Sequence, residues 1–195
     1  MYNVYAQEET GKSHALSWEM ALLKKNGSAY ESIPFRQPLT MTRRDSYQLY
    51  LAFQGEGYCY VIQEDDEGKL PLVYRQSFMP GDRIILPEGA PPEKSGGDFR
   101  AGDLPGTSRL YVIVSAQPRQ NMERLMDQYE RESASTALER SLFSEVLAIR
   151  RNVAAPPDAP ETSVPPAATD PAMKGELRLF EGRDAWVITI TVRVR

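Results

Sequence analysis

Apolar and polar residues alternate over residues 47 to 54 with the period of a β-strand. The apolar positions are Tyr47, Leu49, Leu51 and Phe53, and the positions on the other face are Gln48, Tyr50, Ala52 and Gln54. Successive side chains of a strand point to opposite faces of its sheet. The pattern therefore predicts a strand with one buried face and one face turned toward solvent.

Residues 15 to 25 fit two patterns. Leu16, Trp18, Met20 and Leu22 alternate as in a strand, whereas Leu16, Met20 and Leu23 also fit one face of a helix. Asn26-Gly27 follows directly, and this dipeptide between apolar runs is the strongest short signal of a hairpin. We therefore interpret residues 15 to 25 as the first strand of a hairpin.

Further apolar runs, separated by turn residues, predict the rest of the sheet structure. They cover residues 58–62, 70–74, 83–86 and 110–114, and the turns fall at glycines 55 and 57, at the acidic residues 64–67 and at Pro80-Gly81-Asp82. The first two runs, together with the strand at 47–54, predict an antiparallel meander of three strands. Residues 87 to 106 are rich in Gly and Pro and predict a long surface loop.

Helical spacing of apolar residues begins only after residue 118. One stripe is Met122, Leu125, Met126 and Tyr129, and the next is Leu138, Leu142, Val146 and Ile149. Thr136 and Glu139 form a predicted capping box at the start of the second stripe. The stripes belong either to two helices or to one interrupted helix. Their apolar surface either packs on the sheet, which we favour, or binds another protein.

Proline and alanine dominate residues 153 to 171, with almost no large apolar residue among them. Such a stretch cannot bury enough surface to offset the entropy of ordering it, so it predicts an extended linker. An apolar run at 177–180, a turn at 181–183 and a last alternating stretch at 186–195 follow. The last stretch alternates apolar residues with Thr and Arg, which predicts a strand that returns to the main sheet.

These elements predict one mainly β protein, because 195 residues suffice for one good-sized core with appendages. The predicted fold is an antiparallel β-sandwich-like, immunoglobulin-like domain with an added C-terminal helical segment and a terminal strand. The predicted parts are a flexible tail at residues 1–13, the sandwich at 14–117, the helical segment at 118–152, the linker at 153–172 and terminal strands at 173–195 that pack back on the domain.

The composition narrows the possible partners. A hydrophobic content of 41% and a charged content of 26% are ordinary for a globular protein. The net charge is −4 and no cluster of Lys and Arg precedes the C-terminal end, which argues against nucleic acid as a partner. No apolar run approaches the length of about 20 residues that spans a bilayer, so no membrane span is expected.

Two features bear on the cellular compartment. Cys59 is the only cysteine and cannot form an intramolecular disulfide, so the cysteine count does not distinguish an oxidising from a reducing compartment. Val4 and Ala6 stand where a signal peptidase prefers small residues, ahead of a polar segment. They favour export to the periplasm or cell envelope. The alternative is a short disordered tail in which the small residues stand by chance, on a cytoplasmic protein.

A series of short motifs runs from about residue 36 to residue 118. They are Arg44-Asp45-Ser46-Tyr47-Gln48-Leu49, Gly57-Tyr58-Cys59-Tyr60-Val61-Ile62, Asp66-Glu67-Gly68-Lys69, Leu72-Val73-Tyr74, Pro80-Gly81-Asp82, Ile85-Leu86-Pro87 and the run from Pro105-Gly106 through Leu110-Tyr111-Val112. In this order they resemble a bacterial family, the domain of unknown function 4384. The resemblance implies a β-sandwich-like module, often exported or attached to envelope or signalling proteins, with no agreed catalytic residues. Arg44 departs from the family, in which a glycine is usual before the aspartate.

Catalytic and metal-binding motifs are weak in this chain. Gly11-Lys12-Ser13, with Ala6 ahead of it, matches a relaxed phosphate-loop spacing but lacks the hydrophobic strand that a working loop needs before it. His14 is the only histidine, which leaves no second histidine for a metal site. The acidic turn at 64–67 lacks the ligand spacing of a calcium loop. We therefore predict no enzymatic activity, no cofactor and no metal, with nucleotide hydrolysis at Gly11-Lys12-Ser13 as a distant alternative.

Tyrosines concentrate in the predicted meander and are the remaining candidates for a binding surface. Tyr50, Tyr58 and Tyr60 are the predicted contact residues, with Tyr50 first because it lies opposite the buried face of its strand. Cross-strand packing is the competing interpretation of the same cluster. The sequence thus predicts a non-catalytic interaction module of the cell envelope that binds another envelope protein. The alternative is recognition of a small ligand such as a glycan, by the tyrosine face or the loop at 87–106.

Overall fold

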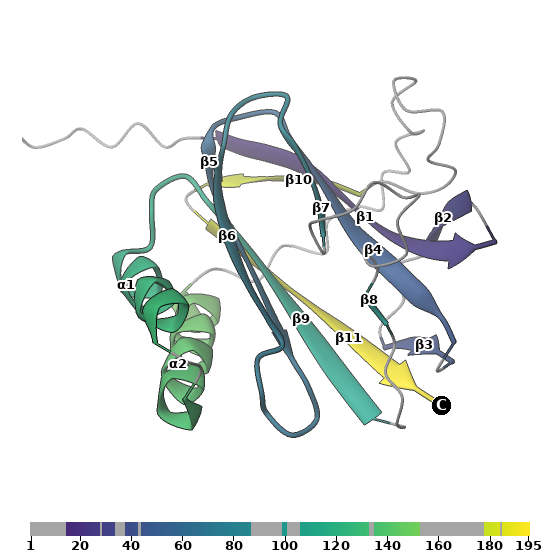
Figure 1. Cartoon of the computed structure of the whole chain (residues 1–195). Helices are drawn as coiled ribbons and strands as arrows, with labels where there is room; N and C mark the ends of the chain where they lie inside the picture. Colours follow the sequence, from purple (N-terminus) through teal and green to yellow (C-terminus); the bar gives the residue numbers. More distant parts are fainter. Residues whose placement is uncertain are drawn as a thin grey trace, which may run out of the picture.

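The computed structural model describes residues 15–27, 29–33, 38–42, 44–86, 99–100, 106–132, 135–152, 178–183 and 185–195. Their strands form two sheets packed face to face, and two helices cover the outer side of one sheet, which gives three layers (Figure 1). The predicted mainly β, sandwich-like fold with a helical segment and a returning terminal strand is confirmed.

Sheet A contains β1 and the strands that pair with it directly or through β4. Its order is β10 (Arg178–Arg183), β1 (Ala15–Asn26), β4 (Ser46–Phe53) and β7 (Arg83–Leu86), with β2 (Ala29–Ile33) beside β1 and β8 (Phe99–Arg100) beside β4. All of these pairs are antiparallel. The strand interpretation of residues 15 to 25 is therefore confirmed.

Sheet B forms the middle layer. Its order is β3 (Leu39–Met41), β11 (Ala185–Val194), β9 (Gly106–Ser115), β5 (Gly57–Glu64) and β6 (Leu72–Phe78). Its pairs are antiparallel except that β3 runs parallel to β11. The terminal strand β11 thus lies inside the sheet, between β9 and β3, as the alternation of its residues predicted.

The space between the sheets is filled by the predicted inward faces of the strands. The side chains of Tyr47, Leu49, Leu51 and Phe53 on β4 are at most 2% exposed. The ring of Phe53 stacks on that of Phe78 from the opposite sheet, with centroids 3.7 Å apart. Each large apolar side chain buried in this way stabilises the fold by about 1.5–3 kcal/mol, so this interior supplies much of the stability.

The chain crosses between the sheets after β4, and here the predicted meander is wrong. β5 pairs with β6 as expected, but β4 pairs with β1 and β7 in the other sheet. Leu51 on β4 and Val61 on β5 are buried in the same interior from its two sides. The alternating pattern fixes which residues of a strand face the core, but it does not say which sheet the strand belongs to.

A second crossing replaces the turn predicted at residues 181–183. β10 continues through these residues as far as Arg183, which pairs with Ala15 in sheet A, and β11 begins at Ala185, which pairs with Ser115 in sheet B. The composition of Glu181-Gly182-Arg183 is typical of a turn, but these residues are extended because they pair with β1. The predicted linker at 153–172 lies outside the described residues.

Gly27 and Gly81 supply backbone conformations that other residues rarely adopt. Gly27 has φ 64° and follows β1 at the predicted hairpin, whose register pairs Asn26 with Ala29. Gly81 has φ 92° and follows Pro80, while the N–H of Asp82 donates to the Met79 carbonyl at 3.0 Å. Proline followed by a glycine of positive φ defines a type II turn, which leads the chain from β6 in sheet B to β7 in sheet A.

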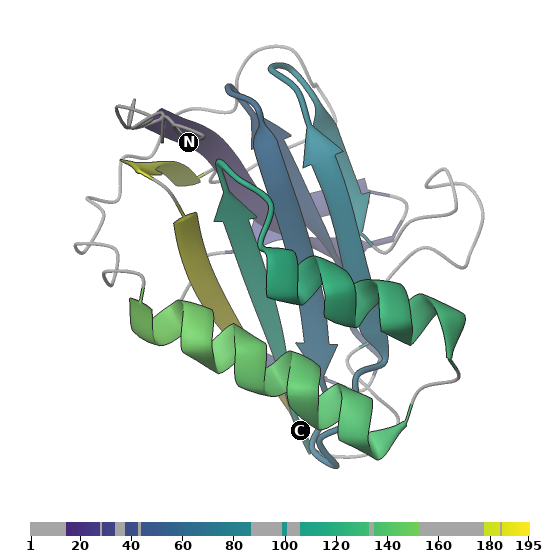
Figure 2. The ribbon, with the colours of Figure 1, turned by 90° about the vertical axis from the view of Figure 1, so that its left-hand side faces the viewer.

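The helical region consists of two helices, α1 (Gln120–Arg131) and α2 (Thr136–Asn152), which lie side by side across the outer face of sheet B (Figure 2). Both predicted apolar stripes face the sheet, and their most buried members are Met122, Met126, Leu142 and Val146. They pack against sheet residues such as Tyr60, Ile62, Tyr111, Ile113 and Val187. The question left open by the sequence is answered in favour of packing on the sheet.

The predicted capping box of Thr136 and Glu139 is wrong, because the helix is capped one residue earlier. The Ser135 hydroxyl accepts from the Leu138 N–H at 3.3 Å, and the Ser135 carbonyl accepts from the Glu139 N–H at 3.0 Å. Ser135 is therefore the capping residue and Thr136 is the first residue of the helix. Serine and threonine cap equally well by composition, so the choice depends on where the chain turns to meet the sheet. Glu139 is released for another contact.

Candidate functional site

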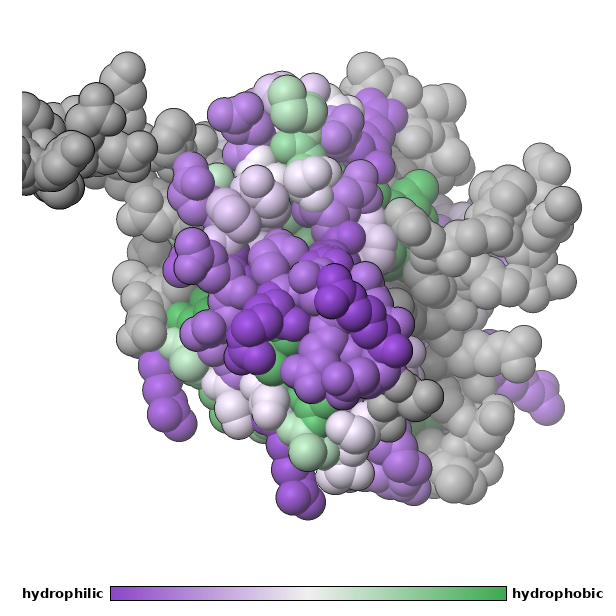
Figure 3. Space-filling model, turned by 60° about the vertical axis from the view of Figure 1, so that its left-hand side comes forward, coloured by the Kyte–Doolittle hydropathy of each residue, from purple (hydrophilic) through white to green (hydrophobic). Residues whose placement is uncertain are grey.

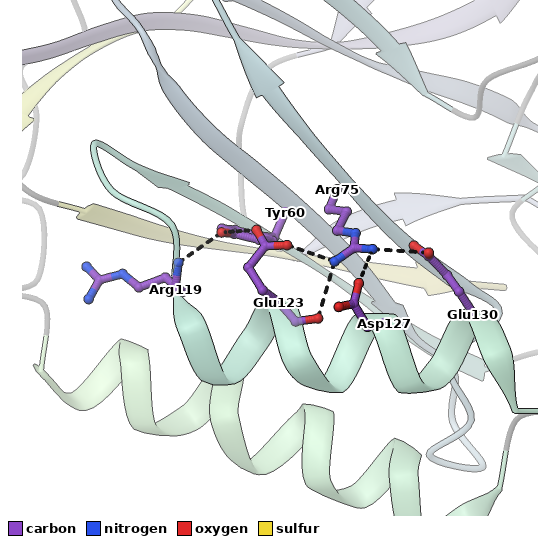
Figure 4. A network of polar contacts seen from close by, with 6 residues as sticks. All are labelled: Tyr60, Arg75, Arg119, Glu123, Asp127 and Glu130. Atoms are coloured by element: carbon purple, nitrogen blue, oxygen red, sulfur yellow. Dashed lines mark hydrogen bonds and ion pairs between the residues drawn. The ribbon is translucent and has the colours of Figure 1, made fainter.

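One arginine of the sheet is bound by the inner helix face. Arg75 on β6 contacts three carboxylates of α1: Glu123 at 2.7 Å, Asp127 at 2.5 Å and Glu130 at 3.1 Å (Figure 4). The same guanidinium also donates to the Glu123 carbonyl at 3.2 Å. Burial acts to lower the pKa of Arg75, but the hydrogen bonds that it donates to Asp127 and Glu123 outweigh burial and raise that pKa. Arg75 thus fixes the position of α1 along the edge strand.

The Tyr60 hydroxyl joins this network to the start of α1. It donates to the Glu123 carboxylate at 2.7 Å and accepts from the Arg119 backbone N–H at 3.0 Å (Figure 4). No side chain caps the first turn of α1, so Tyr60 satisfies a donor at its N-cap residue. Burial and the hydrogen bond to Glu123 raise the pKa of Tyr60, which keeps the hydroxyl protonated.

The turn between β5 and β6 is attached to both helices through Leu70, whose side chain is 3% exposed. Its N–H donates to the Glu139 carboxylate of α2 at 3.3 Å. Its carbonyl accepts from the Tyr129 hydroxyl of α1 at 2.9 Å. The helical layer is therefore held to sheet B by apolar packing, by the Arg75 network and by these two bonds to one residue.

The solvent side of the helical layer is hollowed. A groove of about 680 Å³ runs between α1 and α2, and a hollow of about 340 Å³ adjoins it at the start of α1. The groove is lined mainly by polar and small side chains: Asn121, Arg124, Gln128, Ser135, Ala137, Arg140, Ser141, Ser144, Glu145 and Ala148. This face is largely hydrophilic, with small apolar areas between the polar side chains (Figure 3).

Most of the charged side chains at the groove are not used to hold the fold. Arg124, Arg140 and Glu145 form no ion pair or hydrogen bond through their side chains with any described residue. Ser141 and Ser144 donate to carbonyls one turn earlier in α2, at 2.9 and 2.8 Å, which leaves their oxygens able to accept. The groove can therefore offer donors and acceptors to a bound molecule without breaking an internal contact.

The structure does not bring the three predicted contact tyrosines to one surface. Tyr50 lies on the outer face of sheet A, where it packs with Ala21 and Leu23 and is 5% exposed. Tyr60 is fully buried beneath the helices, and Tyr58 packs at the edge of the same cluster. Tyr50 and Tyr60 are thus on opposite sides of the sandwich. Whether any of the three contacts a partner stays a prediction.

Cys59 and the acidic turn, the other candidates from the sequence, have contacts that belong to the fold. Cys59 is fully buried, and burial raises the pKa of its thiol well above the usual range. In the acidic turn, the Asp65 carboxylate accepts from the N–H groups of Glu67 and Lys69, at 3.0 and 2.8 Å. No three His, Cys, Asp or Glu side chains of the described residues are grouped so as to hold a metal ion. Gly11-Lys12-Ser13, His14 and most of the predicted loop at 87–106 lie outside those residues.

Sequence reasoning missed both Arg75 and the groove. The signal for the network is present, since Glu123, Asp127 and Glu130 recur at the spacing of one helix face, beside the apolar stripe. Their partner could not be named, because Arg75 is distant in sequence and sits in a strand whose pairing was unknown. The groove depends on how the helices pack and has no local signal.

Comparisons with protein families, with curated proteins and with solved structures return no match to this chain. The resemblance to the domain of unknown function 4384 therefore stays a prediction. Within the part of the chain that the structure describes, no helix is long and apolar enough to cross a membrane.

Proposed function

We propose that this protein is a non-catalytic interaction module of the bacterial cell envelope, which binds a protein partner through the groove between α1 and α2. The observation that supports the proposal is the difference between the two sides of the helical layer. Its apolar stripes and the carboxylates on its inner side attach it to sheet B. Its outer side forms the groove, where the side chains of Arg124, Arg140 and Glu145 have no hydrogen bond or ion pair with the described residues.

The rigidity of the support favours binding over catalysis. A helix pair fixed to a sheet by packing, ion pairs and backbone hydrogen bonds presents a preformed surface, which lowers the entropic cost of association. Tyr60 is one of the tyrosines whose pKa is strongly raised, and its hydroxyl has both its hydrogen bonds inside the protein, beneath the helices. The envelope location remains a proposal from the residues around Val4 and Ala6 and from the family resemblance.

The proposal is tested by placing a photo-crosslinking amino acid at Ser141, in the groove, and separately at Ile85. Ile85 is 46% exposed on sheet A and serves as the matched control on the opposite side of the molecule. Irradiation of the native host cells should give one discrete protein adduct from position 141 and none from position 85. The adduct is identified by mass spectrometry and its binding to the purified chain is measured.

Binding of that purified partner should fall about tenfold or more with Ser144→Trp, which fills the groove, because interface contacts at a binding centre contribute about 2 kcal/mol or more. Ile85→Ser should leave the affinity unchanged. An adduct from position 85 and not from 141, or no adduct from either, would contradict the proposal.

Small-ligand binding is the second candidate, and the size of the groove favours it. A volume of about 680 Å³ lies within the range of about 300–1,000 Å³ that small-molecule sites occupy. Its hydroxyl, amide and guanidinium lining suits a polar ligand such as a glycan. Thermal unfolding with cell-wall glycan fragments tests this, since a ligand at 100 times its Kd adds about 2.7 kcal/mol of stability. A rise in Tm that Ser144→Trp abolishes supports this candidate, and no rise removes it.

A further inference from the structure

The helical segment carries balanced charges that the fold separates in space. Residues 118 to 152 contain six arginines and six acidic residues, so this segment has no net charge. The arginines are Arg119, Arg124, Arg131, Arg140, Arg150 and Arg151, and the acidic residues are Glu123, Asp127, Glu130, Glu132, Glu139 and Glu145. Their positions relative to sheet B differ, and the difference is visible only in the folded chain.

Four of the six acidic residues are turned toward the sheet side of the layer and used there. Glu123, Asp127 and Glu130 bind Arg75, and Glu139 accepts from the N–H of Leu70. Glu132 accepts from Gln128 on its own helix at 3.1 Å. Only Glu145 remains without a side-chain contact to the described residues. Four of the six carboxylates are thus held on the side of the helical layer that faces sheet B, away from the groove, and Arg75 offsets one of their charges.

None of the six arginines has an ion pair with a described residue, and all but Arg119 are exposed. Arg124 and Arg140 line the groove, and Arg119 lines the adjoining hollow. The Arg119 side chain points away from the Tyr60 network (Figure 4), and its Nε is buried without a hydrogen-bond partner in the described structure. A buried donor of this kind costs free energy until an acceptor reaches it. Among the described residues, the groove and the hollow are therefore lined by more arginines than carboxylates, and these arginines have no ion pair within the protein.

We propose that the groove and its adjoining hollow bind a carboxylate-rich segment of the protein partner, with Arg119, Arg124 and Arg140 as its cationic contacts. This inference rests on the proposed function and adds the chemistry of the partner. Guanidinium groups bind carboxylates with paired hydrogen bonds, and a concave site lets one segment reach all three. The hydroxyl and amide groups between the arginines suit the backbone of that segment.

Two other anionic partners fit the face less well. Peripheral binding to a membrane uses apolar side chains that insert into the lipid, and the exposed large apolar residues of the described structure are Met79 and Ile85, which both lie outside the helices. Nucleic-acid binding domains are basic overall, whereas this chain has a net charge of −4. A protein segment can place a few carboxylates in the groove, and it lacks the strong long-range negative field of a nucleic acid, which an acidic protein would repel.

Glu145 adds a selective element, because it lines both the groove and the hollow. Its carboxylate repels a purely acidic segment and favours one that presents a donor, such as a backbone N–H or a lysine, between its acidic residues. Replacing Glu145 by Gln keeps the shape and removes the repulsion. This substitution should therefore tighten binding of an all-acidic probe, which no structural role of Glu145 would do.

The test uses the full chain and a fluorescein-labelled peptide of alternating Glu and Ser, with a Lys and Ser peptide of equal length as the control. Fluorescence anisotropy should show binding of the acidic peptide only, weakened as NaCl rises from about 50 mM to about 500 mM. Arg124→Ala and Arg140→Ala should each weaken it about twofold to fivefold and the double variant about tenfold. Glu145→Gln should strengthen it by about the same factor as one arginine.

The arginine variants should keep the wild-type circular dichroism spectrum and Tm, because the replaced side chains have no hydrogen bond or ion pair with the described residues. Arg193→Ala changes an exposed arginine on β11 and should leave peptide affinity unchanged. Equal affinity for a single-stranded oligonucleotide or for anionic phospholipid vesicles would overturn the choice of a protein segment. A dimer in sedimentation velocity that Arg124→Glu/Arg140→Glu abolishes would make a second copy of the chain the occupant instead.

Failure of this inference can be told apart from failure of the proposed function. A specific crosslink at position 141 without binding of the acidic peptide leaves the groove as the binding site and overturns the acidic chemistry. Absence of any crosslink in the groove overturns both.

Discussion

Replacement of Tyr60 by Phe removes one oxygen atom from the centre of the contact between α1 and sheet B. The ring stays in place in a fully buried site, so packing is unchanged. Two hydrogen bonds are lost: the one donated to Glu123 at 2.7 Å and the one accepted from the Arg119 N–H at 3.0 Å. The variant therefore measures how much these bonds stabilise the attachment of the helical layer.

The expected cost follows from the state of each partner. A hydrogen bond to a charged group contributes about 1.5–3 kcal/mol, but Glu123 retains Arg75, so the lower end applies. The Arg119 N–H is left without an acceptor in a partly buried place, which adds about 1 kcal/mol or more. The free energy of unfolding should fall by about 3 kcal/mol, and Tm by about 6–12 °C at this chain length.

Urea unfolding followed by circular dichroism measures the change, with Tyr58→Phe on the same strand as the matched control. The Tyr58 hydroxyl forms no hydrogen bond with a described residue, so its removal should cost less than about 0.5 kcal/mol. The double variant with Glu123→Gln should show a coupling of about 1 kcal/mol with Tyr60→Phe. A Tyr60→Phe protein within about 0.5 kcal/mol of wild type would refute the reasoning.

The same variant has a signature at alkaline pH. The folded protein raises the pKa of Tyr60 above its ordinary value of 10.0. A group whose pKa is raised on folding contributes stability below the unfolded pKa and loses it as pH rises toward the folded one. Above pH 10 the wild type should therefore lose stability faster than Tyr60→Phe, by about 1.4 kcal/mol per pH unit. Equal slopes would show that Tyr60 ionises freely in the fold.

Three further variants test the layers separately. Leu142→Ala removes a fully buried side chain beneath α2 and should cost about 3 kcal/mol in urea unfolding, whereas Ser141→Ala beside it should cost less than about 0.5 kcal/mol. Gly81→Ala meets no atom within 4 Å but has φ 92°, so backbone strain should lower stability by about 1–2 kcal/mol in the same assay. Asp45→Asn removes a carboxylate that accepts from Thr42 and pairs with Lys24 at 2.9 Å. Burial acts to raise the pKa of Asp45, but these contacts outweigh it and lower the pKa below 3.8. The carboxylate therefore stabilises the fold above pH 3.8. In a pH titration of stability, the difference between wild type and Asp45→Asn should vanish as the pH falls through the pKa of Asp45 in the folded state.

The elements of this fold are readable in the sequence because burial repeats with the period of each structure. The alternation of β4 and β11 places Leu51 and Val192 in the interior, and the helical spacing places Val146 against the sheet. The hairpin at Gly27 and the turn at Gly81 follow from residues that tolerate positive φ. Each of these signals depends only on residues close in sequence, so it can be recognised without knowledge of the tertiary structure.

The sequence could not predict which sheet each strand joins, because that is decided by contacts between residues distant in sequence. β4 and β5 each satisfy their alternation whether they pair with one another or face one another across the core. The same holds for Glu181-Gly182-Arg183, whose turn-like composition yields to pairing with β1. The tyrosine hypothesis used the same incomplete information, since the helices that cover Tyr60 were known as elements but not in position.

Composition gives the net charge of the chain but not how that charge is distributed over the surface. A net charge of −4 argues against a long polyanion such as nucleic acid, but it does not say how charge is divided between the faces of the protein. Here Arg75 sits on β6, where it draws three carboxylates of α1 to the inner side of the helical layer. These carboxylates lie away from the groove, which is lined by Arg124 and Arg140. A strand residue thus helps to keep negative charge away from the groove, and Arg75→Met should lower the affinity for the acidic peptide even though residue 75 does not line the groove.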